Sequence, residues 1–169
     1  MVFLSVYDDI WDYLDEIGIL EEVQLIFEDL IGKESFPKHQ SVELYRDMVL
    51  EYALFNYNHE NKLLIEYLSE HLPDSLEERE RKQFMELLDT KRRNLVFIKK
   101  SSRDEADIYG KMMYDFYFRD ADTDEIIIIV SSTELEKKGH ELNMRLIRNP
   151  SYPNERYNVI GLIHTPDQL

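Results

Sequence analysis

The chain has 169 residues, no cysteine, and 35 acidic against 20 basic residues, which gives a formal net charge of −15 at pH 7. This length suffices for one domain or two small modules, and 43% hydrophobic residues can form a core, which excludes a disordered tail. The absence of cysteine excludes disulfide scaffolds, thiolate zinc sites and cysteine nucleophiles, and it fits a reducing cytoplasm. The sequence shows neither a secretory signal nor an apolar run near the ~20 residues of a membrane span, so we expect a cytoplasmic protein that does not enter a membrane.

The charge is divided unevenly along the chain. Residues 1–90 hold 22 acidic and 7 basic residues, a net charge of −15, whereas residues 91–169 hold 13 of each. The first positive side chain is Lys33. Such asymmetry indicates two regions with different surroundings. We therefore predict an acidic helical region at residues 1–93 and a small β module at residues 94–169.

The N-terminal segment shows helical periodicity. Apolar residues recur at steps of three and four over residues 3–17, which predicts a helix that ends at Gly18. A second helix is predicted over residues 20–31. The residues expected to face the core in this second helix are Val23, Phe27, Leu30 and Ile31.

Three further helices are expected before the β module. Residues 41–57 are apolar almost all round, which predicts the central and most buried helix. A fourth helix is predicted to end at or before Pro73. The pair Ser75 and Glu78 has the spacing of a capping box, so a fifth helix is expected to start at Ser75 and to run toward Arg93.

The last part of the chain reads as short strands. A hairpin is predicted where the acidic segment DADTDE joins two strands, and the spacing of all the strands is typical of a small barrel of OB or SH3-like size. We therefore expect an α+β fold, with about five helices followed by a small antiparallel β-barrel or a strongly bent sheet. The five predicted strands are NLVFIKK, KMMYDFYFRD, EIIIIVSS, HELNMRLIRN and YNVIGLIHT.

Residues 74–163 also carry several features in a recognisable order: a helix rich in Glu and Arg, a strand, the DADTDE hairpin, a basic turn with Gly139, and the segment RLIRNP. In this order they resemble the C-terminal part of certain uncharacterised prokaryotic proteins. Those proteins have helices in front of a small β module and in some cases metal-binding tails of the SEC-C type. The resemblance implies the same architecture and no particular chemistry. Because this chain has no Cys- or His-rich tail, it does not point to a metal role here.

The acidic hairpin segment DADTDE matches a calcium-binding loop only in part. Asp120, Asp122 and Asp124 match the first three ligand positions of an EF-hand, but Glu125 replaces the required Gly and Ser131 the bidentate Glu. A turn whose short side chains bond local backbone amides is the better interpretation. No histidine pair has metal-ligand spacing, so no metal and no cofactor is expected. The five histidines are His39, His59, His71, His140 and His164.

Sequence motifs for catalysis are missing. The chain has no nucleophile elbow, no Walker A loop and no dinucleotide-binding glycine pattern. An enzyme of unknown reaction is therefore the last of three hypotheses. It would require a concave pocket with perturbed carboxylates.

The leading hypothesis is a non-enzymatic protein-interaction module. The first two predicted helices carry acidic residues on one face, which is suited to a basic protein partner. The residues predicted to form this face are Asp8, Asp12, Asp15, Glu16, Glu21, Glu22, Glu28 and Asp29.

The alternative hypothesis is binding of RNA or single-stranded nucleic acid by the β module. In this hypothesis a basic segment between the two regions supplies cations for the phosphates, and the second predicted strand supplies aromatic rings for base stacking. The net charge of −15 disfavours a nucleic-acid ligand. Two other interpretations rank higher for the basic segment: pairing with acidic residues of the helices, or pairing between two chains in a homodimer. Core filling is likewise favoured over stacking for the aromatic residues. The residues concerned are Lys91, Arg92, Arg93, Lys99, Lys100 and Arg103, and Tyr114, Phe116, Tyr117 and Phe118.

Overall fold

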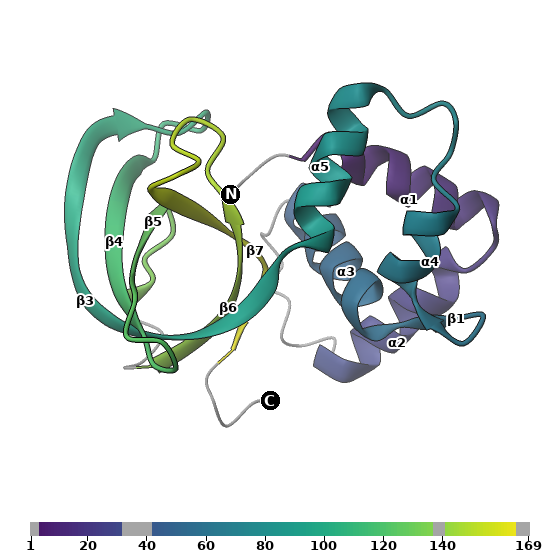
Figure 1. The fold of residues 1–169 in the computed structure, drawn as a ribbon, viewed down its shortest axis with the longest axis horizontal. Coiled ribbons are helices and arrows are strands. Elements are labelled where there is room, and N and C mark those ends of the chain that lie inside the picture. Colours follow the sequence, from purple (N-terminus) through teal and green to yellow (C-terminus); the bar gives the residue numbers. More distant parts are fainter. Residues whose placement is uncertain (1–3, 32–41, 137–140, 165–169) are drawn as a thin grey trace. The chain divides into compact units, whose positions relative to one another are not determined.

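The computed structural model describes residues 4–31, 42–136 and 141–164 and confirms the α+β class. The chain forms two compact units, Phe3–Asp89 and Thr90–Leu169, the second together with Met1–Val2. Figure 1 shows helices in the first unit and a barrel in the second. Gly139 of the predicted basic turn, His39 and His140 lie outside the described residues.

The first unit contains five helices within its described residues. α1 ends as expected, because Gly18 has a positive φ of 82° that terminates the helical backbone. α3 lies centrally, in contact with α1, α2 and α4. The helices are α1 (Val6–Glu16), α2 (Leu20–Ile31), α3 (Val42–Asn56), α4 (Leu64–Glu70) and α5 (Glu78–Leu88).

The fourth helix ends before Pro73 as predicted, since α4 ends at Glu70, whereas the capping box predicted for the fifth helix was wrong. The predicted fourth helix is preceded by a hairpin of β1 (Asn58–His59) and β2 (Lys62–Leu63), whose turn residues have positive φ angles of 51° and 67°. The Ser75 capping box is not formed, because α5 is capped at Glu77 and has no side-chain cap hydrogen bond.

The second unit is a closed five-stranded barrel with the strand order β3-β4-β5-β7-β6, closed by pairing of β6 with β3. The prediction of an all-antiparallel barrel was wrong at one place, since β5 and β7 run parallel. The first strand thus pairs with the second and fourth, and the third with the fifth. The strands are β3 (Lys91–Ala106), β4 (Met112–Asp120), β5 (Ile126–Ser131), β6 (Glu141–Arg148) and β7 (Arg156–His164).

Alternation along the strands builds the barrel core. Phe116 and Phe118 of β4 are fully buried and point inward, as the interpretation of the aromatic residues as core predicted. They pack against Leu95 of β3 and against Ile127 and Ile129 of β5. Because side chains alternate between the two faces of a strand, the residues between them on β4 and β5 point outward.

β3 is longer than the sequence indicated. It has 16 residues and starts at Lys91, directly after α5 and Asp89. The basic residues Lys91, Arg92 and Arg93 therefore lie in a strand and not in the last turn of a helix, which contains no basic residue. The extra length follows from barrel closure, since β3 pairs with β6 at its start and with β4 along the rest.

Candidate functional site

The eight acidic residues of the predicted partner-binding face lie on the first two helices. Asp8, Asp12, Asp15 and Glu16 belong to α1, and the other four belong to α2. All are exposed except Glu28, which is half-buried. The structure therefore places the whole set at the surface of the helical unit.

Three of these carboxylates are held by side chains of α3 or its C-terminal end. Asp8 forms an ion pair with Arg46. Two tyrosine hydroxyls donate to the others, and the pKa of each tyrosine is raised, by burial first and then by its carboxylate partner. The pairs are Tyr45–Glu28 and Tyr57–Glu22, each 2.9 Å.

α2 also exposes large apolar side chains. Leu25, Ile26 and Leu30 have exposed fractions of 55%, 37% and 64%. On a helix, residues four apart lie one above the other. Glu21, Leu25 and Asp29 therefore form one row, and Glu22, Ile26 and Leu30 form the row beside it. We name these six residues the α2 face.

The exposure of Leu30 corrects the prediction that it faces the core. The buried stripe of α2 is formed by Leu20, Val23 and Phe27. Leu30 follows Phe27 by three positions and Val23 by seven, so it borders this stripe but is not covered by the core. Seven of the twelve residues of α2 are apolar, more than one side of a helix can bury. That excess was visible in the sequence and is the signal that could have identified the α2 face.

The basic residues of the second unit have partners within that unit. Arg93 Nη1 lies 3.1 Å from Asp120 Oδ2 and 3.0 Å from Glu125 Oε2. Lys100 Nζ lies 2.6 Å from Glu136 Oε1. Much of the positive charge of the predicted basic segment is therefore balanced locally.

Asp115 is the centre of a buried charge cluster that the sequence did not indicate. This carboxylate is 7% exposed and accepts hydrogen bonds from Arg103 Nη1 at 2.8 Å and Arg156 Nε at 3.2 Å. Both guanidinium groups also lie over the ring of Tyr152, at 5.3 and 4.9 Å from its centroid. The pKa of Arg103 is raised, first by its hydrogen bond to Glu105 and further by Asp115.

The aromatic strand β4 offers one ring on the outside of the barrel. Phe116 and Phe118 are in the core and Tyr114 packs against it, whereas Tyr117 points outward with Lys99 Nζ at 4.8 Å from its centroid. Tyr117 and Tyr152 are thus each faced by a cation of the same unit. A nucleobase that stacked on either ring would compete with these cation–π contacts.

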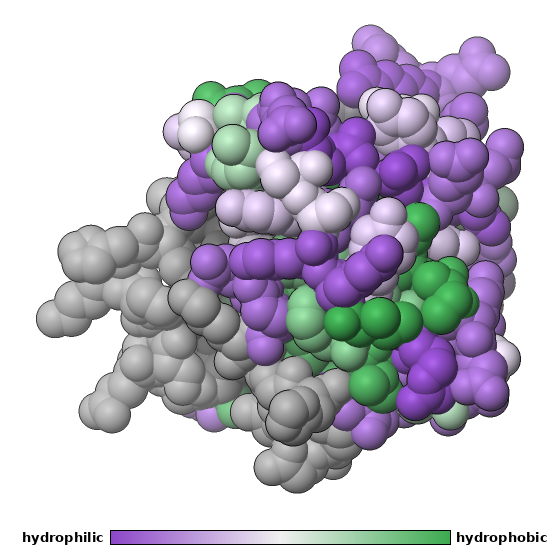
Figure 2. All heavy atoms as spheres, turned by 90° about the vertical axis from the view of Figure 1, so that its left-hand side faces the viewer, coloured by the Kyte–Doolittle hydropathy of each residue, from purple (hydrophilic) through white to green (hydrophobic). Residues whose placement is uncertain are grey.

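The outer face of β3, β4 and β5 combines apolar and basic residues. Pairing places Lys99, Tyr117 and Ile128 in one row across the strands, and Arg119 beside Ile126 in the next. Ile98 sits at the β3 irregularity between these rows and is 49% exposed, and Ile126 is 55% exposed. Figure 2, which looks onto this unit, shows hydrophobic side chains gathered among hydrophilic ones. We name Ile98, Lys99, Tyr117, Arg119, Ile126 and Ile128 the strand face.

The acidic turn between β4 and β5 is a hairpin turn, as interpreted from the sequence. Asp120 Oδ1 accepts hydrogen bonds from the backbone amides of Asp122 and Thr123 at 2.8 and 3.1 Å. Burial by itself would raise the pKa of Asp120, but these amides and Arg93 together hold it below the usual range. The carboxylate therefore serves the turn and the ion pair with Arg93.

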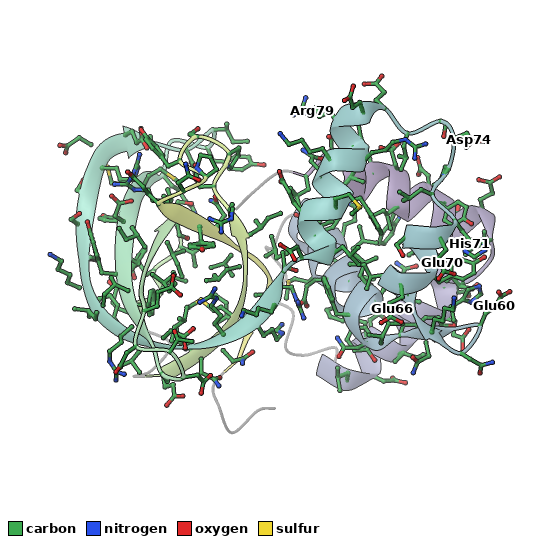
Figure 3. The ribbon with its side chains drawn as sticks, in the orientation of Figure 1. Glu60, Glu66, Glu70, His71, Asp74 and Arg79 are labelled. Carbon is green, nitrogen blue, oxygen red and sulfur yellow. The ribbon has the colours of Figure 1, made fainter. Side chains whose placement is uncertain are left out.

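Histidines and carboxylates also occur together around α4. His59 and His71 contact the ring of Tyr67, at centroid distances of 4.6 and 4.2 Å. His59 lies in β1. Figure 3 labels His71 with Glu60, Glu66 and Glu70 in this region. Across residues 4–31, 42–136 and 141–164, no group of three or more such side chains could hold a metal ion.

A small apolar pocket lies between α1 and the α4–α5 connection. It has room for about one water molecule and is too small for a substrate, so it gives the enzyme hypothesis no support. Its lining residues are Asp9, Ile10, Tyr13, Leu68, Leu72, Pro73 and Leu76. Within the described part of the chain, no helix is both long and apolar enough to cross a membrane.

No protein-family model, curated protein or solved structure matches the chain.

Proposed function

We propose that the protein is a non-enzymatic interaction module whose α2 face, flanked by the acidic residues of α1, binds a basic amphipathic segment of a protein partner. The observation that supports this most directly is the exposure of Leu25, Ile26 and Leu30 among Glu21, Glu22 and Asp29. Isolated exposed leucines need no explanation, but three on one helix face form a contiguous patch.

The two kinds of side chain on the α2 face supply different parts of the binding energy. Covering side chains that are already about half-buried yields about 1 kcal/mol each, so three of them supply most of the affinity of a weak complex. The carboxylates contribute selectivity and a faster approach of basic partners. No basic residue occurs before Lys33, so no positive side chain within α1 and α2 offsets the negative potential of these carboxylates.

These properties define the chemistry of the partner. A helix with apolar residues at positions i, i+3 and i+4 presents a stripe that can lie along the two rows of α2. Lysine or arginine on either side of that stripe would meet Glu21, Glu22 and Asp29. An acidic or purely polar segment would lack one or both of these contacts.

The test uses defined probes and fluorescence anisotropy. A labelled amphipathic helical peptide of Leu and Lys should bind the full chain, and the same peptide with Glu in place of Lys should not. The double variant Leu25→Ala/Leu30→Ala should weaken binding at least tenfold, because about 2 kcal/mol of apolar contact is removed. Met85→Ala is the matched control, since Met85 is 56% exposed on α5 of the same unit.

The result that would contradict the proposal is equal affinity of both peptides, or an unchanged affinity in the α2 double variant. A single-stranded oligonucleotide is the third probe and tests the alternative hypothesis of nucleic-acid binding, in which a base would have to displace Lys99 from Tyr117, or Arg103 and Arg156 from Tyr152. Oligonucleotide binding that falls steeply with salt and survives Leu25→Ala/Leu30→Ala would favour that alternative.

A further inference from the structure

We propose that the chain associates head to tail, with the α2 face of one copy bound to the strand face of a second copy. This inference rests on the proposed function because it uses the same α2 face, but the partner surface is the sheet of a second copy and not a helical segment. It adds a role for the strand face, which the proposed function leaves unused.

The two faces are complementary in charge. The α2 face carries the carboxylates of Glu21, Glu22 and Asp29, and the strand face carries Lys99 and Arg119. Arg119 pairs with Asp124, 2.9 Å away, whose side chain is 82% exposed. An exposed pair of this kind contributes roughly 0–1 kcal/mol, so Arg119 can exchange Asp124 for a carboxylate of a second copy at little cost.

The two faces also match in apolar content and spacing. Ile98 and Ile126 are exposed by 49% and 55%, comparable to Leu25 and Leu30 on α2. Residues four apart on a helix are separated by about 6 Å along its axis, and residues two apart on a strand by about 6.7 Å. Because these two spacings are similar, two successive side chains of one α2 row can lie against Ile126 and Ile128.

The distribution of net charge favours this arrangement over a symmetric dimer. A contact between two α2 faces would oppose identical carboxylates and bring together two segments that each carry −15. A contact between two strand faces would oppose Lys99 and Arg119 with their own copies. The head-to-tail contact instead places residues 1–90 of one copy against residues 91–169 of the next, which have 13 acidic and 13 basic residues and no net charge. Such a heterologous contact propagates unless its geometry closes a ring.

Sedimentation velocity of the full chain over a wide concentration range tests the proposal. The mass should rise above that of a monomer with concentration, and this rise should weaken at high salt. Leu25→Lys on the α2 face and Ile126→Glu on the strand face should each weaken association at least tenfold. Ile108→Glu should change nothing, because Ile108 is 89% exposed on the β3–β4 loop, outside the strand face.

Mixing the two face variants gives the decisive result. Leu25→Lys retains an intact strand face and Ile126→Glu an intact α2 face, so an equimolar mixture should form a 1:1 dimer that grows no further. Far-UV circular dichroism and Trp11 fluorescence, measured on each variant, check that both remain folded. A chain that carries both substitutions should not join the mixture.

Three results would overturn the proposal. They are a wild-type chain that is monomeric at every concentration, a mixture that stays monomeric, and an assembly that disappears after nuclease treatment. If the wild-type chain is monomeric but still binds the basic helical peptide through Leu25 and Leu30, the self-association fails and the proposed function stands. If neither assembly nor peptide binding occurs, both fail.

Discussion

The helical unit and the β unit use charge in opposite ways. In the helical region most carboxylates lie at the surface, with 22 acidic against 7 basic residues in residues 1–90. In the β unit the numbers are equal, and the buried carboxylates of Asp115 and Asp120 are bonded to arginines. The buried carboxylates of the β unit therefore stabilise its fold, whereas exposed carboxylates of α2 such as Glu21 and Asp29 remain accessible to another molecule.

We expect each unit to have its own hydrophobic core and to unfold separately. Large-to-small substitutions in each core can test this. Phe116→Ala in the barrel and Phe27→Ala in α2 each remove a fully buried ring, and each should cost about 3–5 kcal/mol of the unfolding free energy of its own unit. Trp11 of α1 is the single tryptophan of the chain, so its fluorescence reports on the helical unit. In urea titrations Phe27→Ala should shift the Trp11 transition and Phe116→Ala should leave it in place.

Hydrogen exchange of the strand amides provides the reciprocal measurement. Those amides should lose protection in Phe116→Ala and keep it in Phe27→Ala. A common transition for both variants would show that the two units unfold together.

The different roles of charge predict different costs of removing a carboxylate. Asp115→Ala leaves the guanidinium groups of Arg103 and Arg156 side by side without their shared partner, and Arg103 is only 11% exposed. Because these groups are partly screened by solvent, we expect a loss of about 2–3 kcal/mol. Asp8→Ala, which removes the pair with Arg46 at a side chain that is 55% exposed, should cost roughly 0–1 kcal/mol. Urea unfolding of both variants measures the difference, and equal costs would refute the distinction.

Acid should change the contributions of Asp9 and Asp120 to stability in opposite directions. The pKa of Asp9 on α1 is raised above 3.8, by burial first and then by neighbouring carboxylates such as Glu80. Asp9 therefore contributes stability to the helical unit as the pH falls through that raised pKa, and this contribution is complete below about 3.8. The pKa of Asp120 lies below 3.8, so the β unit keeps this contribution above that pH and loses it as the pH falls through the lowered pKa.

The effect of pH is expected to be smaller than the effects of the core substitutions and of Asp115→Ala. Segment-resolved hydrogen exchange between pH 6 and pH 3 measures it. Asp9→Asn should remove the stabilisation of the helical unit on acidification, and Asp120→Asn should remove the loss in the β unit at the lowest pH. If Asp9→Asn leaves the pH dependence of the helical unit unchanged, or Asp120→Asn that of the β unit, the assignment of that group is contradicted.

Local patterns in the sequence were sufficient for most elements. The predicted bounds of α2 agree with the structure, Gly18 ends α1, and the strands around the acidic turn form the expected hairpin. These features depend on periodicity, on the backbone freedom of glycine and on short polar side chains that bond nearby amides. All of these are properties of neighbouring residues, which a sequence shows directly.

The sequence could not locate features that depend on residues far apart. Asp115 and Arg156 are separated by 41 positions, and nothing local distinguishes them from other charged residues. The length of β3 and the parallel pair of β5 and β7 follow from barrel closure, which pairs strands that are not consecutive. The Ser75 prediction failed because the N-cap of α5 is Glu77, two residues later than the pattern indicated.

The sequence by itself determined the α+β class, the division of charge between the two halves, and the acidic character of the first two helices. Only the tertiary structure decided which side of α2 is buried, because Leu30 and Val23 are equally apolar and packing selected Val23 for the core. It likewise decided that Tyr117 points outward while Phe116 and Phe118 fill the barrel. A helix or strand presents more apolar residues than one face can bury, and the surface left over, where partners bind, is fixed only when the core is complete.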